Sequence, residues 1–333
     1  MKKRIRIALV GATGLVGREI IRVLEESELV DAMPVFLASK ASEGEEIPYK
    51  GLEGSVIDLE TFNFKDMDVV VFATPKSVAA KYIPEAQKSG AVVLDISGAS
   101  AADVPVAGAA VGTKGKVVAC PQPAALALAE VLAPLHGKAT VTRVISNVNH
   151  STSSAGKKAM DELYRQSVAL LGGSGAGAVE NEHFATQMAF NVLPQVGAFM
   201  DDGRTTMEKN IQTDVHKLLG ADVPVSISCA YVPTFIGISQ SVNVTFKNAL
   251  TADEARHILE GCTSLTVIDN PKDGEYSTPF GAAEMASVYV SRIRVDDSLP
   301  NTLNLWIVAD NLRAGVAESA VRMVEQVATG LAA

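Results

Sequence analysis

The chain has 333 residues, of which 47% are hydrophobic, and its formal net charge is -9 at pH 7. A chain of this length exceeds the size at which one hydrophobic core usually stops growing, so we expect two domains. The acidic balance disfavours nucleic acid and a membrane surface as partners. The three cysteines, an odd number without paired metal-ligand spacing, indicate reduced thiols in a cytoplasmic protein and predict no metal site.

A short apolar run at residues 5–10 predicts a buried strand rather than a signal peptide, because a glycine ends it after a few residues. The segment GATGLVG at residues 11–17 follows and leads into an amphipathic helix. Glycines at such a turn let backbone N–H groups approach a pyrophosphate, although the same turn also packs a helix tightly on a strand. The candidate cofactor contacts here are Gly11, Thr13, Gly14, Leu15, Val16 and Gly17.

The second predicted strand, residues 34–39, bears on the choice of cofactor. No acidic residue stands at its end to hold a free ribose hydroxyl, which argues against the NAD pattern. Strand and helix patterns then alternate, with strands at 69–73, 91–95 and 117–120 and a helix at 79–88. This βαβ rhythm implies a parallel, doubly wound sheet of the Rossmann-like type.

The pattern changes after residue 135. Longer alternating runs predict strands at 140–148, 225–231, 242–246 and 303–308, with helices at 155–170 and 205–219 and a glycine-rich loop at 172–177. We expect an α+β domain with a mainly antiparallel sheet over residues 135–312. The first domain is predicted to span residues 1–134, and a last helix is predicted at 314–331.

The segment VVACPQPAALAL, residues 117–128, predicts a strand, a turn and a buried helix. Pro123 suits the first position of that helix, since its absent N–H would be unpaired there anyway, and the apolar run over 124–132 is long enough to be buried. Cys120 is interpreted as a structural thiol.

Several segments carry a family resemblance. QMAFNVLPQ at residues 187–195, AGKKAMDEL at 155–163 and ADNLRAG at 309–315 join GATGLVG and the loop at Pro121 in one order over nearly the whole chain. Together they resemble the aspartate-semialdehyde dehydrogenase family. The resemblance implies an NADP cofactor contacted also by Asn311, and a homodimer formed through the second domain. It also implies that the last helix returns to the first domain, which then regains residues 313–333.

The resemblance also shows which chemical groups are missing. In the family, a cysteine attacks the aldehyde, hydride leaves for NADP, and phosphate attacks the thioester, while a histidine handles the proton and an arginine holds the substrate carboxylate. The cysteine position is Pro123, the histidine position is Ile238 and the arginine position is Tyr231. None of these side chains supplies the group that the reaction needs.

Other positions that the resemblance assigns differ as well. Those facing substrate and nicotinamide correspond to His150 and 153–154, and a glutamate and lysine three apart correspond to Met207 and Asn210. No arginine lies between residues 95 and 114 for phosphate. His150 is interpreted as a surface or hydrogen-bonded residue rather than a new base.

The family arginine for the NADP 2′-phosphate corresponds to Ala41. Ser39 and Lys40 are the candidate contacts there, with Lys40 as a stand-in cation and Glu43 and Glu45 opposing it. An ordinary solvated turn explains these residues as well.

We therefore predict a homologue of the Usg type that keeps the scaffold, has a binding, scaffold or regulatory role, and binds NADP weakly or not at all. The alternative is an active NADP-dependent oxidoreductase acting on an aldehyde or acyl phosphate through Cys120. The expected partners are a second copy of the chain or a genuine family enzyme.

Overall fold

The computed structural model describes residues 5–30, 32–100, 116–175, 177, 179–220 and 222–330. These residues form two units, one running to Pro121 and resuming at Val316, the other spanning Gln122–Gly315. The predicted loop at 172–177 and the end of the last predicted helix, at 331, fall partly outside the described residues.

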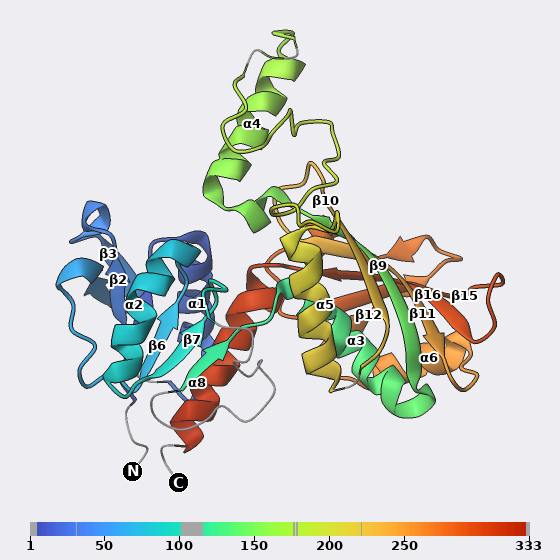
Figure 1. Ribbon diagram of the computed structural model, residues 1–333, viewed down its shortest axis with the longest axis horizontal. Helices are drawn as coiled ribbons and strands as arrows, with labels where there is room; N and C mark the ends of the chain where they lie inside the picture. Colours follow the sequence, from blue (N-terminus) through green and yellow to red (C-terminus); the bar gives the residue numbers. More distant parts are fainter. Residues whose placement is uncertain are drawn as a thin grey trace. The chain divides into compact units, whose positions relative to one another are not determined.

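The first unit contains a six-stranded parallel sheet with the order β5-β2-β1-β6-β7-β8 (Figure 1). Its strands are β1 (Ile7–Val10), β2 (Val35–Ala38), β5 (Ile57–Asp58), β6 (Val69–Phe72), β7 (Val92–Asp95) and β8 (Val117–Ala119). The strand order reverses between β1 and β6, where such sheets form a ligand crevice at the carboxyl ends of the strands. A separate hairpin pairs β3 (Glu46–Tyr49) with β4 (Leu52–Ser55).

Helices cover both faces of this sheet because alternate strand residues point to opposite sides. Ile7 and Leu9 of β1 join the core formed with α1 (Leu15–Glu26) and α8 (Glu318–Gly330). Ala8 and Val10 join the core on the other face, formed with α2 (Lys76–Lys88). The doubly wound parallel sheet predicted from the βαβ rhythm is confirmed.

The second unit is built on a mixed sheet with the order β10-β9-β11-β16-β15-β12. Its strands are β9 (Val141–His150), β10 (Val225–Tyr231), β11 (Ile238–Phe246), β12 (Leu265–Val267), β15 (Val288–Val295) and β16 (Thr302–Ala309). The central pairs are antiparallel, as predicted, whereas the two edge pairs, β10 with β9 and β12 with β15, are parallel. A small hairpin, β13 (Asp269–Asn270) and β14 (Glu275–Tyr276), lies beside β15.

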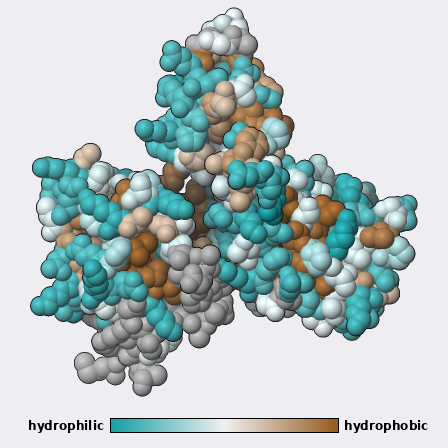
Figure 2. Space-filling model, viewed as in Figure 1, coloured by the Kyte–Doolittle hydropathy of each residue, from teal (hydrophilic) through white to brown (hydrophobic). Residues whose placement is uncertain are grey.

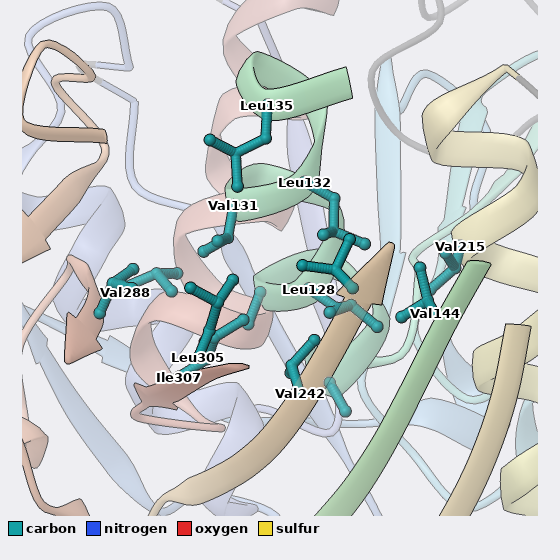
Figure 3. Packing of buried hydrophobic residues seen from close by; sticks show 14 of the residues in the cluster. Leu128, Val131, Leu132, Leu135, Val144, Val215, Val242, Val288, Leu305 and Ile307 are labelled. Atoms are coloured by element: carbon teal, nitrogen blue, oxygen red, sulfur yellow. The ribbon is translucent and has the colours of Figure 1, made fainter. Parts of the chain in front are cut away.

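Helix α3 (Pro123–Ala139) forms the centre of the second unit's core. Its leucine and valine side chains point toward residues of the strands, among them Val242, Leu305 and Ile307 (Figure 3). Helices α5 (Thr206–Leu219) and α6 (Ala252–Glu260) pack beside it. The helix is longer than the predicted 124–132. The predicted first domain, ending at residue 134, includes most of α3, which the structure groups with the second unit because its apolar residues pack on that unit's sheet.

Helix α4 (Lys157–Leu171) extends away from the sheet (Figure 1) and holds the segment around residues 182–189 through buried polar side chains. Glu162, fully buried, accepts hydrogen bonds from the backbone N–H groups of 182 and 183. Gln166 accepts from the N–H groups of 188 and 189. On the part of the surface formed by α4 and the segment that it holds, Figure 2 shows hydrophobic patches among hydrophilic residues. The exposed large hydrophobic residues of α4 and the following segment are Tyr164, Val168, Leu171, Phe190, Val192, Phe199 and Met200.

Candidate functional site

The glycine turn between β1 and α1 is shaped by two glycines that no larger residue can replace without a shift. Gly11 has a φ of +92°, and a Cβ there would lie 2.3 Å from the carbonyl oxygen of Ala73. A Cβ at Gly17 would lie 2.1 Å from the carbonyl oxygen of Gly11. Gly14 has more room, since the nearest atom to its Cβ would be 3.4 Å away. Gly11 therefore forms the turn against β6, and Gly17 allows α1 to pack close to it.

A cleft of about 730 Å³ opens in the first unit at the carboxyl ends of β1, β2 and β6. The predicted cofactor contacts that line it are Gly11, Thr13, Gly14, Ser39 and Lys40. Leu15, Val16 and Gly17 instead form the first turn of α1, whose Gly14 N-cap has no side chain to bond its N–H groups. Sequence reasoning missed Asp58, Thr74, Lys81 and Tyr82 in the lining. The signal for Asp58 was its place at the end of a parallel strand, and the signal for the other three was their place just after such a strand or on the helix that follows it.

This cleft fits a dinucleotide. The uncapped start of α1 offers N–H groups and a favourable dipole to a pyrophosphate. The hydroxyl oxygen of Thr74, which lines the cleft, is buried without a hydrogen-bond partner in the described part of the chain. Buried polar groups are seldom left unpaired, so this hydroxyl is suited to a ligand in the cleft.

The turn that follows β8 carries the residues that the resemblance matches to the family's nucleophile loop. The backbone N–H of Cys120 donates to the carbonyl oxygen of Asp95 at 2.8 Å, and the thiol packs partly buried against the first unit's core. Burial raises the pKa of the Cys120 thiol well above its usual range, and the charge of Asp95 raises it further. The thiol is therefore held in its unreactive, protonated form.

Pro123 is the first residue of α3, as predicted. The residue before it, Gln122, is the N-cap, and its backbone N–H donates to a carboxylate oxygen of Asp214 on α5 at 2.8 Å. Asp214 is partly buried, and burial raises the pKa of its carboxyl. This contact, and the hydrogen bond that Gln240 Nε2 donates to the carbonyl oxygen of Ala124 at 2.9 Å, hold the start of α3. A prolyl ring stands there at the position where the resemblance places the nucleophile.

Three of the positions assigned by the resemblance lie in one row across the second sheet. Tyr231 of β10 pairs with His150 of β9, and Ile238 of β11 pairs with the same His150. The ring of Tyr231 contacts those of His150 and Phe184, at centroid distances of 6.2 and 5.2 Å. Burial raises the pKa of Tyr231 to about 12, so its phenol stays neutral. The row therefore contains no positively charged side chain that could hold a substrate carboxylate.

His150 is not the surface or hydrogen-bonded residue that the sequence interpretation expected. Its side chain is 4% exposed, and its Nε2 is buried without a hydrogen-bond partner in the described chain. Burial lowers the pKa of His150 to about 4. The interpretation was wrong because the burial of this residue depends on its neighbours in the sheet, Tyr231 and Ile238, which sequence periodicity does not reveal.

The neutral His150 makes stability pH-dependent. Its pKa in the folded chain, about 4, lies below the ordinary 6.5, so the unfolded chain binds the proton more readily. The stabilisation is complete above pH 6.5 and is lost as pH falls toward 4. Between pH 7 and 4.5 we expect the wild type to lose roughly 2 kcal/mol more unfolding free energy than His150→Leu. Urea titrations at both pH values measure this difference, and equal losses in the two proteins would contradict it.

Asn311, a predicted cofactor contact, is a buried hydrogen-bond acceptor within the second unit. Its Oδ1 accepts from the backbone N–H of Gly237 at 2.8 Å and from the hydroxyls of Ser153 and Ser151 at 3.0 and 3.3 Å. These hydrogen bonds connect the segment after β16 to the segment after β9 and to the residue before β11. A cofactor contact by Asn311 stays a prediction.

Among the described residues, no group of three or more His, Cys, Asp or Glu side chains is arranged to hold a metal ion. The helices of that part of the chain also include none that is long and apolar enough to cross a membrane.

A parallel sheet with a glycine turn at its switch point, followed by a second unit on a mixed sheet, defines a two-domain scaffold of the NAD(P)-dependent dehydrogenase class. The family model described as the semialdehyde dehydrogenase NAD binding domain matches residues 6–152. The model described as the semialdehyde dehydrogenase dimerisation domain matches residues 132–314. The chain belongs to the aspartate-semialdehyde dehydrogenase family.

Relatives match over nearly their full length. Aspartate-semialdehyde dehydrogenase from Rickettsia typhi is 35% identical, covering 98% of both chains, and that from Aquifex aeolicus is 34% identical, covering 96% of this chain and 97% of its own. A crystal structure of the Vibrio cholerae enzyme II complexed with ASA has a TM-score of 0.92 at 29% identity, covering 98% of this chain and 99% of its own.

Proposed function

We propose that this chain binds a nicotinamide adenine dinucleotide in the first unit's cleft and forms a homodimer, but does not perform the dehydrogenase reaction for which its relatives are named. The role that remains is binding, scaffolding or regulation, as in the Usg type of homologue. Pro123 carries this proposal because it stands at the family's cysteine position. Tyr231 and Ile238 support it, since neither can hold a carboxylate as arginine does or move a proton as histidine does.

The setting of Pro123 supports the same conclusion. A Cβ added to Gly315 would lie 2.5 Å from the Cβ of Pro123, so the prolyl ring packs directly on this glycine. Gly315 ends the segment ADNLRAG, one of those that resemble the family. The proline is accommodated by helix geometry and by packing, and no nucleophilic atom replaces the missing sulfur.

The test combines a binding and an activity measurement on the same protein. Calorimetric titration with NADP⁺ and with NAD⁺ is expected to show micromolar binding of at least one. Incubation with NADP⁺, phosphate and aspartate semialdehyde is expected to give no NADPH above a protein-free control. Turnover at the rate of a family enzyme would overturn the loss of chemistry, and absence of binding to both nucleotides would overturn the cofactor part.

A second candidate function is an active NADP-dependent oxidoreductase that uses Cys120 on an aldehyde or acyl phosphate. The comparisons favour it, because relatives matching over the full chain bear the enzyme's name. The residue geometry opposes it, because the pKa of the Cys120 thiol is raised by burial and by Asp95.

Alkylation separates these candidates. We expect Cys120 to react with iodoacetamide at pH 7 more than tenfold slower than a free thiol in a peptide, because its thiolate is scarce. Peptide mass mapping over time measures the rate, and Cys262, which is also partly buried, serves as the internal comparison. Fast, selective labelling of Cys120, with turnover lost in Cys120→Ser, would establish the second candidate.

We propose that the homodimer uses the face of the second sheet that points away from α3. The alternation of burial along β9, β10, β11 and β16 turns small uncharged side chains to this side. They include Asn147, Ser226, Ser228, Ser241, Asn243 and Asn304, with Trp306 among them. Arg143, which donates to the amide oxygen of Asn243, is the charged residue that these four strands turn to the same face. Depletion of charge is typical of the centre of an interface. Sedimentation of the wild type and of Ser241→Arg tests this, and an unchanged dimer in the variant would place the interface elsewhere.

A further inference from the structure

The turn after β2 and the glycine turn approach each other beside the cleft. In dinucleotide-binding sheets the adenosine ribose lies between these two turns, and a cation near the end of the second strand takes a 2′-phosphate when there is one. Here the hydroxyl oxygens of Ser42 and Thr13 are 3.5 Å apart, so the two turns are neighbours. The position of a ribose is therefore bracketed by described residues of one unit.

Arg18 bridges the same two turns. Its Nε donates to the carbonyl oxygen of Thr13 at 3.1 Å, and its Nη2 donates to a carboxylate oxygen of Glu45. The guanidinium thus lies between the two turns that bracket the ribose, just outside the residues that line the cleft, although it stands on the first helix, far in sequence from the turn after β2. A guanidinium binds phosphate well through its fixed fork of donors.

Glu45 is placed to hold this guanidinium. Its backbone N–H donates to the carbonyl oxygen of Ser42, and its own carbonyl oxygen accepts from the N–H of Val56, so the residue is fixed between the turn and the hairpin. The side chains of Arg18 and Glu45 are 51% and 39% exposed. Exposed ion pairs are weak, so the pair can be separated by a competing anion, but the carboxylate remains beside it.

We propose that Glu45 is a specificity-determining residue that lowers the affinity of the cleft for a ribose 2′-phosphate by occupying Arg18 and placing a negative charge beside the phosphate. Lys40 is then the cation in the turn after β2 that is left to contact a 2′-phosphate. The affinity of the cleft for cofactors without that phosphate is not reduced. The proposal rests on dinucleotide binding in this cleft and extends it by naming what sets the choice between NADP and NAD.

The test uses the adenosine halves of the two cofactors as probes, 2′,5′-ADP and 5′-AMP, on the full chain. Glu45→Gln is expected to tighten binding of 2′,5′-ADP roughly fivefold, the effect of about one exposed charge pair, and to leave 5′-AMP unchanged within twofold. The matched control is Glu46→Gln, the exposed carboxylate one residue later at the start of β3, which is expected to change the binding of neither ligand. Arg18→Gln added to Glu45→Gln is expected to remove the gain.

The possible results are distinct. An equal change for both ligands in Glu45→Gln would mean that Glu45 acts on the shape of the turn and would overturn the specificity role. A fivefold gain that survives the loss of Arg18 would overturn the part assigned to the guanidinium. Failure of every protein, wild type included, to bind either ligand would overturn the proposed dinucleotide binding together with this inference.

Discussion

Pro123→Cys alone is expected to give no useful dehydrogenase turnover. The substitution restores a thiol at the first position of α3, but Ile238 and Tyr231 still supply neither a base nor a carboxylate clamp. A missing general base lowers rates by roughly 10²–10⁴-fold, and residues that act as a unit are not rescued singly. NADPH formation from aspartate semialdehyde, phosphate and NADP⁺ measures the result.

The informative comparison is with the triple variant Pro123→Cys, Tyr231→Arg and Ile238→His. Because the last two positions flank His150 in one row of the sheet, the three changes restore groups at positions that the resemblance treats as one site. We expect its turnover to exceed that of the single variant by about 10²-fold or more. Circular dichroism controls for folding, since Ile238 is 1% exposed and a histidine there is buried. Family-like turnover from the single variant would show that the correspondence along β11 is wrong.

Gly11→Ala is expected to destabilise the chain by roughly 2–5 kcal/mol and to abolish nucleotide binding. The new Cβ would lie 2.3 Å from the carbonyl oxygen of Ala73, and a φ of +92° is itself strained for alanine. Either the turn or the end of β6 must move, and both line the cleft. Urea unfolding and calorimetric titration with NADP⁺ and NAD⁺ measure the two effects.

Gly14→Ala provides the matched control. It lies in the same turn, but its Cβ would have 3.4 Å to the nearest atom and its φ, -77°, suits any residue. We expect a change in unfolding free energy below about 1 kcal/mol. Equal losses at both glycines would show that the close approach of Gly11 to β6 does not govern this turn.

The elements that were predicted could be placed from the sequence because each had a local signal. Strands β12 and β15 and helix α6 of the second unit were not predicted. The glycine spacing at 11–17 marked the turn, and the alternating apolar residues of 225–231 gave β10 to the residue. The length of α3 was underestimated because Pro134 interrupts its sequence pattern, whereas packing against the sheet carries the helix on to Ala139.

The site was less accessible to sequence reasoning because its geometry depends on contacts between distant residues. The row formed by Tyr231, His150 and Ile238 exists through the register of three strands, and the unpaired Nε2 of His150 follows from that register. The pairing of Arg18 with Glu45 joins a helix to a turn 27 residues away. From the sequence, Glu45 was identified only as a charge opposing Lys40, and its contact with Arg18 was not predicted.

The intrinsic fluorescence of Trp306 can be used to follow the association of two copies of the chain. It is the one tryptophan of the sequence, its indole N–H donates to the carbonyl oxygen of Ser277 at 3.1 Å, and it lies on the sheet face assigned to the homodimer. Its emission therefore reads the polarity of that face without a label or a background from other indoles. Dilution that separates two copies should shift the emission to longer wavelength, and the midpoint of that shift would give the dissociation constant directly.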